Sequence, residues 1–278
     1  MSQDLNDDGY VLSRTPREYE RLRVQAERWA PFTDQVLARA GLGSGMSVLD
    51  AGCGPGEVMR LMGRRVGQDG VVTGVDIDPE VGAYGLKRLQ GEEACNFNFH
   101  TADLLSGETV PGAPFDMVFC RFLLIHMDDP IAMVRRLAAL TRPGGVLVAM
   151  DYVIAAALVA PPDPVLVRGI EIMNLTLAAA GRSLDAGARL ASWFREAGLP
   201  MPHGTDLHGK MVVTYPDLQL AEGVAGFGPK AVRLGVATEE EIAALPDRIR
   251  AVAARGEHCY HSPTVGAAWT WVGNPATA

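Results

Sequence analysis

The chain has 278 residues, of which 48% are hydrophobic and 21% charged, and its formal net charge at pH 7 is −8. This composition excludes a disordered chain, because enough apolar side chain is present for a core, and the acidic balance argues against a nucleic-acid-binding protein. The four cysteines form no CxxC pair, so neither a disulfide framework nor a four-thiolate zinc site is indicated.

The N-terminal segment lacks the basic-then-apolar pattern of a secretion signal. The most apolar stretch, 144–162, carries Asp151 in its middle, which is typical of a buried strand more than of a membrane span. We therefore expect a cytoplasmic protein that has no membrane partner.

The first predicted elements are helical. Apolar residues recur at helical spacing over 17–42, and Pro31 is expected to break this segment into two helices. A strand at 47–52, a helix at 57–67 and a strand at 70–76 follow. This alternation is the βαβ rhythm of a parallel sheet.

The alternation continues for three more strands. Asp78 and Pro79 open the next helix, strands are predicted at 97–104 and 115–120, and a helix over 128–140 leads into a strand at 144–150. Five strands alternating with helices predict a doubly wound α/β sheet.

The pattern changes after Asp151. Two helical stretches, 165–181 and 186–198, follow a proline-rich turn, and we expect both to form a lid over the carboxyl edge of the sheet. A strand near 206–215, further helical stretches, and a last strand at 265–272 complete the prediction.

The loop after the first strand, VLDAGCGPGE over 48–57, is typical of a ligand-binding loop, because glycine lets the backbone approach a ligand closely. Its glycines, Gly52, Gly54 and Gly56, do not have the GxGxxG spacing of a phosphate-binding loop. Asp50 and Glu57 would repel a phosphate, whereas they suit a cationic or zwitterionic cofactor.

Asp76 ends the second strand, 76 − 56 = 20 residues after the last glycine of the loop. An acid at this place can accept hydrogen bonds from both hydroxyls of a ribose. Because NAD and other adenosine ligands share the ribose, Asp76 alone does not discriminate between them.

Together these residues resemble the class I S-adenosylmethionine-dependent methyltransferases. The motifs of that family are matched in order by the glycine loop, GVDIDP, TADL, FDMVFCRFLLIHMDDP and TRPGGVLVAMD, over roughly 46–151. The resemblance implies S-adenosylmethionine as cofactor, S-adenosylhomocysteine as product, and a Rossmann-like, seven-stranded, mostly parallel sheet whose last strand is antiparallel. It implies cofactor contacts by Tyr10, Asp50, Gly52, Gly54, Gly56, Asp76, Ile77, Asp103, Leu104, Cys120 and Arg121.

Outside this core the chain is similar to ubiquinone/menaquinone biosynthesis methyltransferases and to bacterial natural-product methyltransferases. That likeness implies four parts: an N-terminal helical lid segment (1–45), the cofactor-binding core (46–151), a substrate lid (152–202) and the remainder of the sheet (203–278). Tyr10 is expected to cover the cofactor; anchoring the terminus is its alternative role.

His126, which follows the fourth strand on the ligand edge, is the candidate general base. Its alternative role is structural, as a histidine that packs before the helix at Asp129. Arg121 is expected either to contact the methionine end of the cofactor or the substrate, or to form an ion pair. Asp151 either orients substrate or, as we favour, caps the start of the lid.

The predicted function is methyl transfer from S-adenosylmethionine to a small molecule, in natural-product or quinone-type biosynthesis, with oxygen, carbon and nitrogen acceptors all open. An NAD(P)-dependent oxidoreductase and a non-catalytic S-adenosylmethionine-binding protein are the alternatives. No metal is expected, although the HCYH stretch over 258–261 carries metal-binding residue types. The helices outside the core are compatible with a homodimer.

Overall fold

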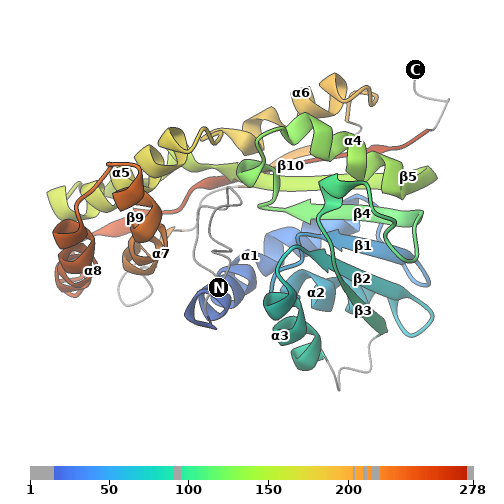
Figure 1. Ribbon diagram of the computed structural model, residues 1–278, viewed down its shortest axis with the longest axis horizontal. Coiled ribbons are helices and arrows are strands. Elements are labelled where there is room, and N and C mark those ends of the chain that lie inside the picture. The colour runs from blue at the N-terminus through green and yellow to red at the C-terminus, as the bar shows by residue number, and fades with distance from the viewer. Residues whose placement is uncertain (1–15, 90–94, 203, 209–211, 214–219, 274–278) are drawn as a thin grey trace, which may run out of the picture.

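The computed structural model describes residues 16–89, 95–202, 204–208, 212–213 and 220–273. Seven strands form the main sheet, in the order β3-β2-β1-β4-β5-β10-β7 (Figure 1). They are β1 (Ser47–Ala51), β2 (Val71–Asp76), β3 (Asn96–Thr101), β4 (Phe115–Arg121), β5 (Thr141–Val153), β7 (Gly204–His208) and β10 (Thr264–Trp271). β10 runs antiparallel to β5 and β7, and the neighbouring pairs from β3 to β5 are parallel. The predicted fold is therefore confirmed.

Helices cover both faces of this sheet. Helices α2 (Glu57–Val66) and α3 (Pro79–Leu89) pack on the β1 to β3 half, whereas α4 (Pro130–Leu140) packs on β4 and β5 from the opposite side (Figure 1). Because both faces are covered, the central strands are mostly apolar, and β4 buries Phe115, Met117 and Phe119 completely. The carboxyl ends of β1, β2, β4 and β5 are thereby held at one edge.

The N-terminal helix differs from its prediction. α1 (Pro16–Arg39) is one continuous helix, and Pro31 lies inside it. Proline removes one backbone hydrogen bond there, but Trp29 before it and Leu37 after it are both buried in the main core, which holds the two halves in line. The Thr33 hydroxyl also donates a hydrogen bond to the Trp29 carbonyl oxygen, at 2.9 Å. The expected break at Pro31 is therefore wrong.

Helix α6 (Ala186–Glu196) also differs from its expected place in the lid. It packs against β5 and β10, and it buries Leu190, Trp193 and Phe194 in the main core. Gly187 allows this close approach, since a Cβ there would lie 2.2 Å from the Asp151 carbonyl oxygen. α6 thus belongs to the layer that covers the sheet, because its apolar face matches that surface.

A second hydrophobic cluster stands apart from the main core. Helices α5 (Pro164–Ala179), α7 (Leu220–Arg233) and α8 (Glu239–Ala253) pack on one another beyond the ligand edge of the sheet (Figure 1). They enclose Leu166, Val224 and Ile249 together with a small sheet of β6 (Leu158–Ala160), β9 (Cys259–His261) and β8 (Val212–Val213). Strands of two or three residues leave no periodic signal, so the sequence did not reveal this sheet. We call this part the helical cap.

None of the helices within the described residues has both the length and the apolar character needed to cross a membrane.

Candidate functional site

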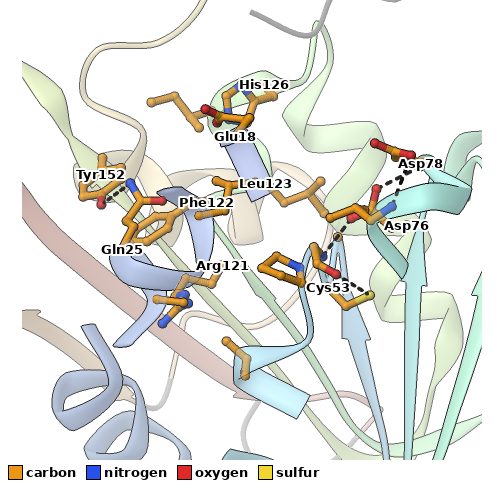
Figure 2. A pocket seen from close by; sticks show the side chains of 18 of the residues that line it. Glu18, Gln25, Cys53, Asp76, Asp78, Arg121, Phe122, Leu123, His126 and Tyr152 are labelled. Carbon is orange, nitrogen blue, oxygen red and sulfur yellow. Dashed lines mark hydrogen bonds between the residues drawn. The ribbon is translucent and has the colours of Figure 1, made fainter. Parts of the chain in front are cut away.

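A cavity of about 590 Å³ lies between the carboxyl edge of the main sheet, α1 and the helical cap. Its volume is within the range of small-molecule and cofactor sites. Figure 2 shows Cys53, Asp76 and Asp78 on one side of this cavity, with Tyr152 and Gln25 on the opposite side. The cavity therefore runs from the β1 and β2 ends, across the β4 end, to the end of β5.

The glycine loop forms one wall of the cavity through Gly52 and Gly54. Gly54 has φ +49°, and a Cβ placed on it would meet no atom within 4 Å, so the space in front of this residue is open. Gly56, in contrast, does not line the cavity. Its φ is +78°, and a Cβ there would lie 3.3 Å from Leu89 Cδ1, so this glycine serves the packing of α2 against α3. Gly54 thus leaves room for a ligand, whereas the space in front of Gly52 is occupied by Leu123, whose Cδ1 would lie 3.0 Å from an added Cβ.

Asp50 is the carboxylate nearest the base of this wall. It is 2% exposed, and its Oδ2 atom has no hydrogen-bond partner among the residues that the structure describes. Burial raises the pKa of Asp50 against the lowering effect of Arg121, and with the smaller raising effect of Asp76 this pKa is about 7. A buried carboxylate oxygen without a donor fits a cationic ligand group such as an ammonium, and it disfavours a phosphate.

Asp76 ends β2 and holds the loop in place. Its Oδ2 atom accepts a hydrogen bond from Gly54 N–H at 2.9 Å, and Oδ1 accepts one from Asp78 N–H at 3.0 Å. Ile77, which follows Asp76, is 49% exposed and lines the cavity. An exposed apolar side chain beside an acid at a strand end suits a ribose with its attached base.

The β3 end supplies Asp103 and Leu104, and both line the same part of the cavity. Asp103 caps the short helix η1 (Leu104–Ser106) by accepting a hydrogen bond from Leu105 N–H at 2.9 Å. Asp78 binds α1 to this region, because its Oδ2 atom accepts a hydrogen bond from the Tyr19 hydroxyl at 2.7 Å. The adenosine-type contacts that the motifs predict are therefore gathered in one place.

Two residues at the end of β4 are predicted to contact the cofactor, and only one of them lines the cavity. Arg121 lines the cavity, and its Nη1 atom donates a hydrogen bond to Thr33 Oγ1 at 2.7 Å. Cys120 is fully buried in the sheet between Ala51 of β1 and Ala149 of β5, and it does not line the cavity. Side chains alternate along a strand, so two adjacent residues do not share a face. The structure thus brings Arg121, but not Cys120, to the site. Tyr10 lies outside the described residues.

His126 lies at the end of η2 (Leu124–His126) and lines the cavity. Burial, together with Arg182 and Arg21, lowers the pKa of His126 to about 4, so the imidazole is neutral at pH 7. Figure 2 shows Glu18 beside it; Glu18 forms a buried ion pair with Arg21 at 2.7 Å. A neutral imidazole is the form that can accept a proton.

Asp151 positions this loop. It is completely buried and does not line the cavity. Its Oδ2 atom accepts a hydrogen bond from Ile125 N–H at 3.0 Å, and Oδ1 accepts one from Tyr152 N–H at 2.8 Å. Asp151 therefore ties η2 to Tyr152, the first residue of the expected lid segment (152–202), and does not reach the cavity.

Several cavity residues were missed in the sequence. Phe122 has φ +57°, unusual for a residue with a side chain, and its ring stacks on Tyr152 with centroids 3.9 Å apart. Tyr152 in turn accepts hydrogen bonds from Trp29 and Gln25 of α1. These partners are more than 120 residues apart in the chain, so no local pattern could have paired them.

The HCYH stretch forms part of β9, from which Tyr260 lines the cavity. His258 Nδ1 lies 2.9 Å from the Pro161 carbonyl oxygen. Within the residues that the structure describes, no group of three or more His, Cys, Asp or Glu side chains is arranged to hold a metal.

The sheet order, the glycine loop and the acids at the ends of β1, β2 and β3 define a Rossmann-like domain for a cationic adenosine cofactor. The profile of the family described as "Methyltransferase domain" matches residues 21–208. This chain therefore belongs to the methyltransferase domain family, whose cofactor is S-adenosylmethionine.

Similar proteins agree with this assignment. The ubiquinone biosynthesis O-methyltransferase of Xanthomonas campestris is 38% identical over 115 residues, which are 41% of this chain and 46% of that protein. The protein of the same name from Xylella fastidiosa is 33% identical over 184 residues, 63% of this chain and 68% of the relative. A putative methyltransferase from Bacillus halodurans shares the fold, with a TM-score of 0.54 at 16% identity over 85% of this chain and 96% of that one. The chain thus spans about half the length of the first of these relatives.

The residues present fit this cofactor. Asp50 would offer a buried carboxylate to its ammonium group, Gly54 leaves open space, and Asp76 at the end of β2 would accept hydrogen bonds from its ribose. An NAD(P) site is disfavoured, because Glu57 lines the cavity at the start of α2, where a pyrophosphate would have to bind.

Proposed function

We propose that this protein transfers the methyl group of S-adenosylmethionine to a small molecule that binds at the cap-covered end of the cavity. The observation that carries the proposal is the continuity of this cavity. One end is lined by Asp50, Asp76 and Asp103, and the same space extends under α5 and α7. A cofactor and an acceptor can thus meet without leaving the enclosed volume.

The cap end is mainly apolar. Met173 and Leu177 of α5 and Leu220 and Phe227 of α7 line it. Such a surface favours a compact apolar molecule over a polymer such as RNA or an unfolded peptide. Since the curated relatives are named ubiquinone biosynthesis O-methyltransferases, we infer a ring compound that carries a hydroxyl group as the methyl acceptor.

Methyl transfer is an in-line displacement at an activated carbon, and the bound cofactor supplies that carbon. The task of the chain is to align the acceptor and to exclude water. Asp50, Asp76 and Asp103 would hold the cofactor, and the cap would close over the acceptor. His126, neutral at pH 7, would accept the proton that a hydroxyl acceptor loses.

The first experiment identifies the cofactor. Freshly purified protein is denatured, and released small molecules are identified by mass spectrometry; calorimetric titration of the emptied protein with S-adenosylmethionine and with NAD follows. We expect S-adenosylmethionine or its demethylated product to be released or to bind. Binding of NAD alone would refute the methyltransferase proposal.

The second experiment tests transfer. Methyl-labelled S-adenosylmethionine is incubated with the protein and a panel of hydroxylated, amino-substituted and carbon-acidic ring compounds, and label transfer is followed. For an oxygen acceptor, His126→Gln is expected to lower kcat by about 100-fold or more with little change in the affinity for S-adenosylhomocysteine. Tight cofactor binding without transfer to any compound would support the alternative of a non-catalytic binding protein.

A further inference from the structure

A polar cluster lies at the end of the cavity that is remote from the proposed cofactor side. It consists of Tyr152 at the end of β5 and of Trp29 and Gln25 on α1. Trp29 Nε1 donates a hydrogen bond to Tyr152 Oη at 2.7 Å, and Gln25 Nε2 donates one at 3.0 Å. Figure 2 shows Tyr152 and Gln25 joined beyond Phe122, on the side away from Asp76.

The cluster has one donor too many for its own hydrogen bonds. The two donated bonds occupy both lone pairs of the Tyr152 oxygen, and the hydroxyl proton has no acceptor within the part of the chain that the structure describes. Exchanging the nitrogen and oxygen of the Gln25 amide would let Tyr152 donate to Gln25, and it would leave the amide N–H groups spare instead. The donor at the cavity wall is therefore the Tyr152 hydroxyl when Gln25 donates through Nε2, and the Gln25 amide in the exchanged arrangement. Tyr152→Phe separates the two, because it removes only the first of these donors.

This donor is neutral and rigidly placed. Burial raises the pKa of Tyr152 far above its usual value, although Arg121 and the bond from Trp29 oppose this, so the hydroxyl stays protonated. The Tyr152 ring is fixed by its stack on Phe122 and by the edge of Trp29, whose centroid lies 5.8 Å away.

Its neighbourhood is also rich in donors. Tyr260 of β9 lines the same cavity, and its hydroxyl has no hydrogen bond to any described residue. The positive charge of Arg121 is already opposed by the buried carboxylate of Asp50, and one of its N–H groups donates to Thr33. A buried anion needs a charged partner that is available to it, whereas a carbonyl or ether oxygen needs only such neutral donors.

On the basis of the proposed function, we infer that Tyr152 donates a hydrogen bond to a neutral oxygen on the methyl acceptor. The acceptor is then an apolar ring compound with its methyl-accepting hydroxyl near His126 and a carbonyl or ether oxygen at its other end. Tyr152 would act as a specificity-determining residue, because a ligand without this oxygen leaves the buried donor unsatisfied.

The test uses two probes that differ in one carbonyl group, 6-hydroxy-1-tetralone and 5,6,7,8-tetrahydro-2-naphthol. Their dissociation constants are measured by ligand-observed NMR on protein saturated with S-adenosylhomocysteine. Tyr152→Phe keeps the ring stack and removes the donor. We expect it to weaken binding of the ketone about tenfold and that of the naphthol less than twofold. Tyr84→Phe, which removes a hydroxyl that lies outside the cavity, is the matched control and is expected to change neither constant.

Tyr152→Phe leaves Trp29 Nε1 without its acceptor, so the double variant Trp29→Phe with Tyr152→Phe is prepared in parallel to remove both partners. The inference is wrong if the wild-type protein does not bind the ketone, or binds it no more tightly than the naphthol. It is also wrong if both variants keep a preference for the ketone. Affinity for S-adenosylhomocysteine is measured in every sample. If the wild-type protein does not bind S-adenosylhomocysteine, the result counts against the proposed function. If it binds S-adenosylhomocysteine but shows no preference for the ketone, only the role of Tyr152 is overturned.

Discussion

Gly54→Ala separates the cost of a strained backbone from the loss of ligand space. Gly54 has φ +49°, and an added Cβ would meet nothing within 4 Å, so no protein atom has to move. A left-handed backbone on a residue with a side chain costs about 1–2 kcal/mol, which in a chain of this size lowers Tm by roughly 2–8 °C. The same Cβ enters the cavity at the point where the glycine loop is proposed to face the cofactor.

Gly235→Ala is the matched control. Gly235 has φ +69°, an added Cβ there would also meet nothing within 4 Å, and the residue does not line the cavity. Both variants are expected to lose similar thermal stability in differential scanning fluorimetry. Only Gly54→Ala is expected to weaken binding of S-adenosylhomocysteine, by roughly 10- to 100-fold in calorimetric titration, as overpacking by one methyl group typically costs about 1–3 kcal/mol. Equal affinities in the two variants would refute the placement of the cofactor against this loop.

Three further predictions concern the site and the layer behind it. Asp76→Asn should weaken S-adenosylhomocysteine binding by roughly 10- to 100-fold, because one charge-assisted acceptor is lost. Asp69→Asn, at an exposed position, is the control and should leave this binding unchanged. Equal calorimetric dissociation constants for the two variants would contradict the ribose role of Asp76. Because the pKa of His126 is lowered from 6.5 to about 4, its neutral form stabilises the fold above pH 6.5, and this stability is lost as the pH falls toward 4. Between pH 7 and 4.5, the free energy of unfolding measured in urea should therefore fall less in His126→Gln than in the wild type, by an amount on the order of 3 kcal/mol. Parallel curves of this free energy against pH would contradict the lowered pKa of His126. Gly187→Ala should destabilise the protein by more than about 3 kcal/mol, since its Cβ would lie 2.2 Å from the Asp151 carbonyl oxygen; a Tm within 2 °C of the wild type would argue against the packing of α6 on β5.

The cofactor side of the site could be predicted from the sequence because its residues follow strand ends directly. Asp50, Asp76 and Asp103 each lie at or just beyond the end of a parallel strand, and such ends meet at one edge of the sheet. Cys120 shows the limit of this reasoning. A motif gives the position of a residue along the chain, but the alternation of side chains in a strand decides which face of the sheet it joins. Cys120 is buried in the sheet and does not reach the cavity.

The remaining differences arise from tertiary packing. Pro31 predicts a helix break when only local hydrogen bonds are weighed, yet Trp29 and Leu37 anchor both halves of α1 in the same core. Helix α6 has an amphipathic pattern that suits a cap or a sheet face equally well, and the contact of Gly187 with β5 decides between them. Tyr152 is separated from Gln25 by 127 positions and from Trp29 by 123, so local sequence patterns carry no sign of this cluster.

The cavity has two walls that differ in how they are built. The proposed cofactor wall is part of the main sheet, where the Asp76 carboxylate accepts a hydrogen bond from Gly54 N–H of the glycine loop. The cap wall comes from α5 and α7, which share a separate core with α8. Phe122, with its left-handed backbone, and Tyr152 lie where these walls meet. Leu220 lines the cavity and belongs to the core of the cap, so its substitution is expected to reshape the proposed acceptor space without altering the sheet. Phe227 also lines the cavity but packs in the main core, and the position of Tyr152 is fixed by β5 and α1 together. In the proposed arrangement, the cap would set the apolar outline of the acceptor, and Tyr152 at the sheet edge would recognise its oxygen.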